Sequence, residues 1–444
     1  MKESINRQII KLAWPAIATN ITTPLLSLVD VAIVGHIGGK ELYVGAVAVG
    51  GTAFNILYWV FAFLRMGTSG MSAQAYGAGA NEEQRSILRR GLTIAVMGSA
   101  MLLFLAPLVG WKAISIIDGS GEVQELAWHY FRIAIWGAPG VLVSYVLSGW
   151  LLGMQRSKSV MWIALTTNVL NILLSTCFVF ILNLGLSGVA MGTAISQIAG
   201  ATFGGFTVAR ICRKMPKKSE KELHKTNIRN SWGKIFRINS DIFLRTMCLA
   251  AVTLWFTHAG SLMGAEILAA NSLMLQLFLV FSYFMDGFAF GGEALAGRYY
   301  GAREIKTLQK TVKSLFKWGI WTSLIFTVLY FVASDLFISW LTSDNGIINV
   351  SSKYRMWIVL VPLAGFSAFT WDGIMIGLTQ TRTLMLSMGI AMGIFFIVYF
   401  FGKAHYENAN HVLWLAFILY LSVRGIVSTL LYRRFIGRLV ATSV

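Results

Sequence analysis

The chain has 444 residues, of which 56% are hydrophobic and only 13% are charged, and its mean hydropathy is +0.66. Soluble proteins of this length are much less apolar, so the composition predicts a membrane protein and excludes a soluble globular one. The formal net charge is +18, but ten basic residues fall within residues 210–237 alone. Such clustering between apolar segments indicates membrane topology and affinity for anionic lipid, and it argues against nucleic-acid binding.

Apolar stretches long enough to cross ~30 Å of hydrocarbon follow one another along the chain. We predict twelve transmembrane helices over residues 10–34, 44–75, 91–114, 127–153, 161–182, 186–211, 233–260, 267–296, 315–341, 354–378, 384–402 and 412–433. The first contains Pro15 and Pro24 and has no small-residue cleavage site after it, so we expect it to be retained as a helix.

An even number of helices places both termini on the same side of the membrane. On this topology, 29 of the 37 Lys and Arg residues lie on the side of the termini, five lie on the other side, and Arg65, Arg132 and Arg245 lie inside helices. This asymmetry predicts cytoplasmic termini and, for a bacterial protein, a multi-pass location in the cytoplasmic (inner) membrane.

Two sequence blocks recur at the same offset of 224 residues. Residues 74–78 recur as residues 298–302, and the block Gly149-x-x-x-Gly153 recurs as Gly373-x-x-x-Gly377. The pattern predicts a tandem duplication: an all-α fold of two parallel six-helix bundles, related by a pseudo-two-fold axis along the membrane normal, with substrate in the cleft between them. We expect an N-terminal lobe over residues 1–211, a basic cytoplasmic linker over residues 212–232 and a C-terminal lobe over residues 233–444.

Motifs for enzymatic chemistry are missing from the sequence. Cys177, Cys212 and Cys248 have no CxxC spacing, the six His residues form no metal-ligand pair, and there is no P-loop, GxSxG or HExxH motif. The sequence therefore predicts a protein that is not an enzyme and has no cofactor or resident metal. A carrier driven by an ion gradient and a channel both remain open.

Acidic residues in the apolar segments differ between the two halves. At the offset of 224 the pairs are Asp30 with Leu254, Asp286 with Ala62, Asp372 with Ser148 and Glu293 with Ser69. Acids within membrane helices are costly and usually functional. Asp30 has no base near it in sequence and is the candidate for carrying H⁺ or Na⁺; the alternative is that it caps a helix end or faces solvent.

The second half suggests charge pairing. Asp241 and Arg245 are four residues apart and are expected to pair within one helix. Asp286 is either a cleft group for a cationic substrate or the partner of a base such as Arg65. Asp372 and Glu293 are assigned to the same roles, and Asp372 is expected to cap or pair in the tenth helix. Adaptable cleft-lining residues are predicted at Met66, Met71, Met274 and Met285.

Several segments in both halves resemble one known family. They are residues 63–70 (FLRMGTSG), 149–155 (GWLLGMQ), 241–246 (DIFLRT), 268–271 (LAAN), 283–290 (YFMDGFAF) and Asp372-Gly373. The whole chain resembles the DinF branch of the multidrug and toxic compound extrusion (MATE) family. This resemblance implies a two-lobed antiporter, monomeric, which exports amphipathic and often cationic small molecules in exchange for H⁺ or Na⁺.

The resemblance also implies an ion site in the N-terminal lobe. The family pattern maps onto Asp30, Asn171 and Thr193, with Tyr130 and Pro15 also matching, but Ser175 replaces the second aspartate of the pattern. A single acid among neutral oxygens favours H⁺ over Na⁺. Pro15 either kinks the first helix or simply begins it. A lipid or lipid-linked flippase of the same superfamily and a channel or receptor are the alternatives; the first needs a strongly cationic cleft, and nothing resembles the filter of the second.

Overall fold

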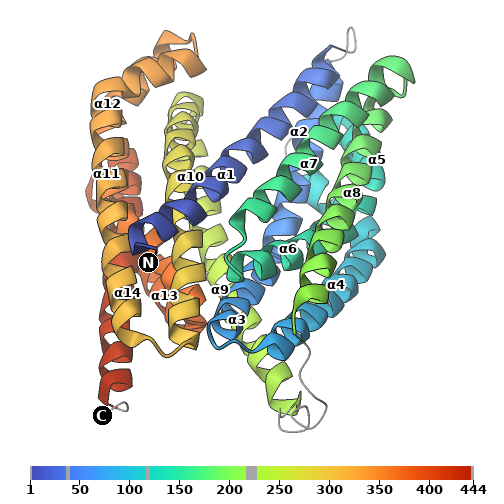
Figure 1. Ribbon diagram of the computed structural model, residues 1–444. Coiled ribbons are helices and arrows are strands. Elements are labelled where there is room, and N and C mark those ends of the chain that lie inside the picture. The colour runs from blue at the N-terminus through green and yellow to red at the C-terminus, as the bar shows by residue number, and fades with distance from the viewer. Residues whose placement is uncertain (1–2, 37–40, 117–120, 217–227, 442–444) are drawn as a thin grey trace. The chain divides into compact units, whose positions relative to one another are not determined.

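The computed structural model describes residues 3–36, 41–116, 121–216 and 228–441, and these ranges contain helices and no strands (Figure 1). The helices are α1 (Ile5–Gly35), α2 (Glu41–Val60), α3 (Phe63–Gly77), α4 (Asn81–Ile116), α5 (Gly121–Ala134), α6 (Ala138–Gly153), α7 (Ser157–Thr176), α8 (Gly185–Lys214), α9 (Ile228–Ser261), α10 (Ala265–Gly301), α11 (Ile305–Leu341), α12 (Asn345–Gly377), α13 (Thr381–His405) and α14 (Ala409–Ala441). A 3₁₀ turn at Ile135–Gly137 joins α5 to α6, and a π-helical turn at Cys177–Ile181 ends α7.

The described helices form twelve membrane-length segments, because α2 with α3 and α5 with α6 each make one segment. Ten of the segments are long and apolar enough to cross a membrane by length and composition. The predicted all-α membrane fold is therefore confirmed, and each predicted span coincides with one segment.

The duplication is visible in the positions of the helices. Helices begin at residues 41 and 265, 81 and 305, 121 and 345, 157 and 381, and 185 and 409, and each pair is separated by 224 residues. The left-handed backbone recurs at the same spacing: Gln155 (φ 61°) matches Thr379 (φ 53°), and Gly79 (φ 66°) matches Arg303 (φ 60°). The same turn geometry thus connects the same helices in both halves.

The chain divides into two compact units. The N-terminal unit comprises residues 14–235 with residues 300–303, and the C-terminal unit comprises residues 236–299 and 304–444 together with the residues before Trp14. Helix α1 therefore contributes to both units, whereas the sequence analysis assigned its first turns to the N-terminal lobe. The expected linker at residues 212–232 lies partly outside the described residues; α8 ends at Lys214 and α9 begins at Ile228.

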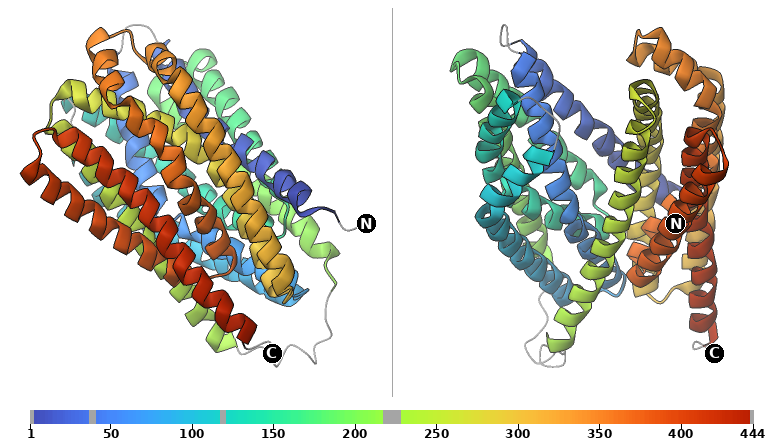
Figure 2. Two further views of the ribbon diagram at one scale, coloured as in Figure 1. Left: turned by 90° about the vertical axis from the view of Figure 1, so that its left-hand side faces the viewer. Right: turned by 180° about the vertical axis from the view of Figure 1, so that it is seen from behind.

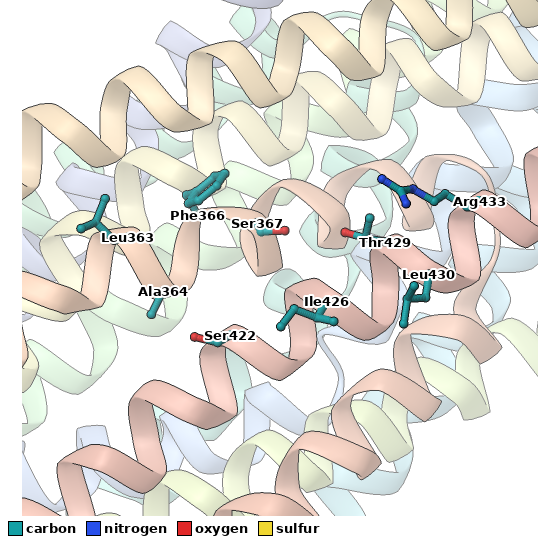
Figure 3. A pocket seen from close by; sticks show the side chains of 9 residues that line it. All are labelled: Leu363, Ala364, Phe366, Ser367, Ser422, Ile426, Thr429, Leu430 and Arg433. Atoms are coloured by element: carbon teal, nitrogen blue, oxygen red, sulfur yellow. The ribbon is translucent and has the colours of Figure 1, made fainter.

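Each unit is a bundle of long helices packed in pairs (Figure 2). In the N-terminal unit α7 packs along α8 and α3 along α6, while in the C-terminal unit α11 packs along α12 and α13 along α14. Helix α14 also packs on α12, where a Cβ added to Gly425 would lie 2.7 Å from the Ser367 hydroxyl oxygen. Figure 3 shows Ser367 on α12 beside this stretch of α14.

The repeated glycine block is a helix-packing motif. A Cβ added to Gly149 of α6 would lie 2.3 Å from the Arg65 carbonyl oxygen, and one added to Gly153 would lie 2.6 Å from the Ser69 carbonyl oxygen. In the C-terminal unit the corresponding contacts are Gly373 to the Ala289 carbonyl oxygen at 2.0 Å and Gly377 to the Glu293 carbonyl oxygen at 2.4 Å. Small residues four apart allow two membrane helices to approach backbone to backbone.

Among the described residues, two membrane-length segments of the N-terminal unit are interrupted by turns, whereas the corresponding segments of the C-terminal unit are continuous helices. Hydrogen-bonded turns at Phe61 and Ala62 separate α2 from α3, and the 3₁₀ turn separates α5 from α6. The matching stretches of the C-terminal unit lie inside the continuous helices α10 and α12. Asp286 occupies the place in α10 that corresponds to Ala62.

We predict that Gly373→Ala destabilises the protein by about 1–3 kcal/mol, because the new methyl group meets a backbone carbonyl that cannot rotate away. Gly389→Ala on α13 is the matched control, because nothing lies within 4 Å of an added Cβ there. Thermal unfolding of the purified proteins in detergent measures the difference. Equal midpoints for the two variants would contradict the packing role of Gly373.

Candidate functional site

Asp30 is buried inside the N-terminal unit, five residues before the end of α1, with 6% of its surface exposed. Its carboxyl group interacts with the Asn171 side chain of α7 and lies within electrostatic range of Tyr130 on α5. The alternative that Asp30 faces solvent is therefore wrong in this structure. A carboxyl group surrounded by side chains of other helices is the arrangement expected of a functional membrane acid.

A polar network surrounds this acid. The Asn171 Nδ2 atom donates a hydrogen bond of 3.0 Å to the Thr193 hydroxyl of α8, which donates to the Val189 carbonyl oxygen. The Tyr130 hydroxyl interacts with Thr193 as well. The structure thus brings together side chains of four helices that the sequence analysis had selected from separate segments.

Three oxygens of this region are buried without a hydrogen-bond partner among the described residues: Asp30 Oδ1, Asn171 Oδ1 and Ser175 Oγ. Buried polar atoms are nearly always hydrogen-bonded, and leaving one unpaired costs ~1–3 kcal/mol. All three oxygens can accept a hydrogen bond or a cation. The two on Asp30 and Asn171, whose side chains interact, suit a site that takes up a proton or a cation, and Ser175 lies one helical turn from Asn171 on α7.

Ser175 has no exposed surface and faces α8. A Cβ added to Gly192 would lie only 2.4 Å from the Ser175 Oγ atom, so the two helices are in close contact beside Thr193. A larger side chain at position 175 would therefore be crowded. The position at which the family pattern has its second acid thus lies at a close contact between α7 and α8.

Pro15 is the eleventh residue of α1, which begins at Ile5. The alternative that Pro15 merely begins the helix is therefore wrong. An interior proline cannot donate the backbone hydrogen bond to the residue four positions earlier, so the helix is weakened there. Thr19 Oγ1 bonds the Pro15 carbonyl oxygen at 2.9 Å.

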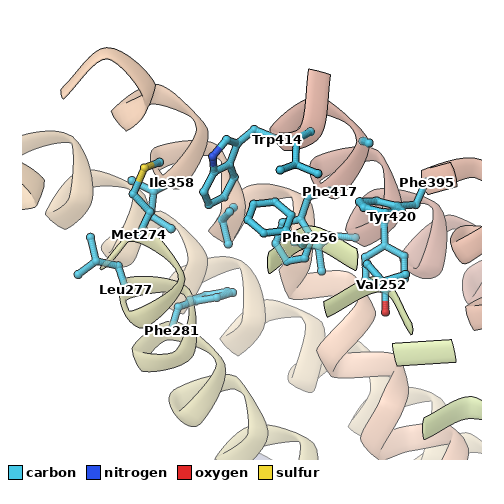
Figure 4. Close-up of a cluster of buried hydrophobic side chains, with 14 of the residues drawn as sticks. Val252, Phe256, Met274, Leu277, Phe281, Ile358, Phe395, Trp414, Phe417 and Tyr420 are labelled. Carbon is cyan, nitrogen blue, oxygen red and sulfur yellow. The ribbon is translucent and has the colours of Figure 1, made fainter. Parts of the chain in front are cut away.

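The matching place in the C-terminal unit is apolar. At the offset of 224, Tyr130, Asn171, Ser175 and Thr193 correspond to Tyr354, Phe395, Tyr399 and Phe417, all members of one buried hydrophobic cluster (Figure 4). The ring centroids of Phe395 and Tyr399 are 6.5 Å apart. Leu254, which corresponds to Asp30, is 65% exposed on α9. Packed rings thus occupy the positions at which the N-terminal unit has its polar network.

A separate charge cluster lies inside the C-terminal unit. The Asp372 carboxylate on α12 accepts hydrogen bonds from Arg245 on α9 and from Arg424 on α14, the latter at 2.8 Å. Both arginines are 5% exposed, and Asp286 on α10 lies within electrostatic range of Arg424. Arg424 also stacks over the Tyr420 ring. Asp372 therefore joins three helices through charge-assisted hydrogen bonds.

Asp241 and Arg245 were expected to pair within α9. The structure gives both residues partners on other helices, because Arg245 binds Asp372 and the Asp241 carboxylate accepts a hydrogen bond of 2.8 Å from the Thr381 hydroxyl of α13. These contacts are long-range in sequence, so spacing alone could not indicate them.

Sequence reasoning missed Arg424. It counted this residue among the cytoplasmic bases, although a lone arginine in the apolar interior of the last helix is itself a signal of a buried partner. Of the remaining candidates, Glu293 is 1% exposed in α10, and Arg65 lies within electrostatic range of Tyr145 in the N-terminal unit. The pairing of Arg65 with Asp286 stays a prediction.

The four methionines fall in different surroundings. Met274 and Met285 have no exposed surface and belong to the hydrophobic cluster, so they line no cleft in this structure. Met71 lines a cavity of about 210 Å³ together with Gln74 and Lys234. Met66 is partly buried on α3.

Within the described residues, no group of three or more His, Cys, Asp and Glu side chains could hold a metal ion. A Na⁺ ion at Asp30 would therefore rely on the neutral oxygens around it. A proton needs only the carboxylate.

Comparison with known proteins identifies the family. A family model described as MatE matches residues 15–177 and 241–400. The chain is 33% identical over 431 residues to DNA damage-inducible protein F of Escherichia coli (strain K12), across 97% of this chain and 93% of that protein. The chain belongs to the MatE family of membrane transporters. Within this family it is a DinF-like member, and it is a transporter, not an enzyme.

Further MatE relatives agree. The chain is 25% identical over 358 residues to a probable multidrug resistance protein NorM of Thermotoga maritima, covering 78% of this chain and 74% of the relative. A Vibrio cholerae MATE transporter, VcmN in the bent form, matches with a TM-score of 0.85 at 17% identity over 98% of this chain and 97% of that chain. A MATE structure in the bent conformation matches with a TM-score of 0.88 at 17% identity over 99% and 97%. These structures confirm the fold.

We predict that removing the shared carboxylate with Asp372→Ala destabilises the protein by about 3–5 kcal/mol, because two buried guanidinium groups lose their partner. The control is Asp335→Ala, which breaks a half-exposed pair with Arg355 and should cost no more than ~1 kcal/mol. Thermal unfolding in detergent measures both. A cost at Asp372 no larger than at Asp335 would show that the buried cluster contributes little to stability.

Proposed function

We propose that this MatE transporter is a secondary antiporter that exports amphipathic, often cationic compounds in exchange for H⁺ or Na⁺ by alternating access. The observation that carries the proposal is the buried Asp30, with its unpartnered oxygen, held by neutral polar groups of α5, α7 and α8. The names of the relatives support export of drugs or toxic compounds, since one is a probable multidrug resistance protein.

Coupling follows from the cost of charge in a membrane. An ionised carboxylate inside hydrocarbon is unfavourable by at least ~2.5–3.5 kcal/mol, so binding a proton or cation at Asp30 changes which arrangement of α1 is stable. Protonation converts one carboxyl oxygen from an acceptor into a donor, and the free Asn171 Oδ1 and Ser175 Oγ atoms are acceptors. The interior Pro15 is the place at which α1 would respond.

We favour H⁺ as the coupling ion. Na⁺ prefers several oxygen ligands, and the site provides one carboxylate with neutral amide and hydroxyl oxygens. Ser175 is packed against Gly192, which limits the adjustment that would bring its hydroxyl to a cation.

The proposed setting is the cytoplasmic (inner) membrane of a bacterium, with both termini in the cytoplasm and the protein acting as a monomer. The Escherichia coli relative supports a bacterial setting, and the distribution of Lys and Arg supports this orientation. A flippase for lipid-linked substrates gains Arg424 as a further intramembrane base. Asp372 and Asp286 together offset the charges of Arg245 and Arg424, however, so the cluster provides little excess positive charge.

We predict that Asp30→Asn abolishes gradient-driven efflux while the protein stays folded in the membrane, because the amide keeps the shape of the side chain and loses the ionisable group. Dye uptake into inverted vesicles, with pH and Na⁺ gradients imposed separately, measures the effect and identifies the ion. Asp335→Asn, at a half-exposed acid, is the control and should transport normally. Undiminished transport by Asp30→Asn would remove Asp30 from the coupling mechanism.

A second prediction concerns Ser175. Restoring an acid with Ser175→Asp should increase the dependence of transport on Na⁺, since a second carboxylate favours a cation. The crowding at Gly192 should also lower stability by about 1–3 kcal/mol. Ser175→Ala is the control and should keep transport driven by the pH gradient. The same vesicle assay decides: if folded Ser175→Asp protein shows unchanged Na⁺ dependence, Ser175 does not set the ion preference.

A further inference from the structure

A groove runs between α12 and α14 in the C-terminal unit and encloses about 320 Å³ (Figure 3). Its apolar wall consists of Leu363 and Phe366 from α12 and Ile426 and Leu430 from α14. Ile426 and Leu430 are 58% and 53% exposed, as expected of side chains that face the hydrocarbon of a bilayer.

Two hydroxyl groups along the groove, those of Ser422 and Thr429, are hydrogen-bonded within the protein. Ser422 donates to the Ile418 carbonyl oxygen at 2.9 Å, and Thr429 donates to the Gly425 carbonyl oxygen at 2.7 Å. Thr429 also accepts a hydrogen bond of 2.7 Å from the Trp371 indole. These hydroxyls therefore need no water, and the groove suits a hydrocarbon chain.

One end of the groove is cationic. The Arg433 side chain extends back over Thr429, so its guanidinium group lies at the mouth of the groove (Figure 3). No described carboxylate forms an ion pair with Arg433. Arginine offers several donors in a planar fork and binds phosphate well.

The length of the groove matches one leaflet. From Ser422 to Arg433 α14 advances eleven residues, or ~16 Å at ~1.5 Å per residue. The hydrocarbon core of a bilayer is ~30 Å thick, so the groove is about as long as the hydrocarbon layer of one leaflet. This is the depth that one acyl chain occupies.

We propose that this groove binds one anionic phospholipid, with its phosphate on Arg433 and an acyl chain along Ile426 and Leu430. The membrane leaflet is the one that faces the basic ends of the helices, which is the cytoplasmic leaflet in the orientation proposed above. Anionic head groups in that leaflet complement the exposed arginine. Nothing in the coupling site takes part in this contact.

The test is native mass spectrometry of the purified full-length protein with an equal mixture of phosphatidylglycerol and phosphatidylcholine. The wild type should retain one phosphatidylglycerol molecule in preference to phosphatidylcholine. Arg433→Gln should weaken that preference about fivefold, the ratio expected for one interfacial arginine. Arg434→Gln is the matched control, since Arg434 is the exposed neighbour outside the groove lining and should bind as the wild type does.

A second variant distinguishes the contribution of the apolar groove from that of the Arg433 charge. Leu430→Trp fills the groove and leaves Arg433 intact, so it should also lose the bound phosphatidylglycerol. Equal losses in Arg433→Gln and Arg434→Gln would show diffuse attraction to a basic surface and overturn the proposal, as would full retention by Leu430→Trp. Lipid binding is measured on purified protein without a gradient. Absence of lipid binding would therefore not contradict the coupling role of Asp30, and loss of transport in the vesicle assay would not contradict lipid binding in the groove.

Discussion

The contact of glycine with backbone carbonyl groups is the constraint on which both helical units depend. In hydrocarbon the backbone is already satisfied within each helix, so helices associate through close packing and a few polar contacts. Gly149 and Gly153 bring α6 against α3, and Gly373 and Gly377 bring α12 against α10. The central helices α6 and α12 then serve as the surfaces on which α8 and α14 pack. The packing of α8 on α6 positions Thr193, and the packing of α14 on α12 positions Arg424.

The two units have corresponding helices and turns but different polar side chains. The turns and helix starts repeat at 224 residues, yet the Asn, Thr and Tyr residues around Asp30 in one unit correspond to aromatic rings in the other, and Asp30 itself corresponds to Leu254. The charges of the C-terminal unit lie elsewhere, around Asp372, where the N-terminal unit has Ser148 and Gly200. The helix packing was therefore retained after duplication, while the polar and charged residues became different in the two units.

The sequence predicted the spans and the repeat, because long apolar runs and repeated small residues are visible in it directly, whereas the residues that meet around Asp30 came from the resemblance to a known family. The sequence analysis paired Asp241 with Arg245, whereas the structure joins them to Thr381 and Asp372 on other helices, and it misplaced Arg424. Helices that are apolar on every side show no period that distinguishes a lipid-facing residue from a buried one. For the same reason Met274 and Met285 were expected in a cleft and lie in a packed core. The interior location of Pro15 required the true start of α1.

Helix α1 belongs to one unit before Trp14 and to the other unit from there on. Pro15 stands next to that division, and Asp30 lies fifteen residues further along the same helix, ~22 Å at ~1.5 Å per residue. In the proposed mechanism, the effect of ion binding at Asp30 can therefore reach the other unit along the backbone of α1, without a chain of side-chain contacts. It can be transmitted along a helix with two interior prolines, Pro15 and Pro24, so the timing of transport would depend on how stiffly α1 resists bending at these residues.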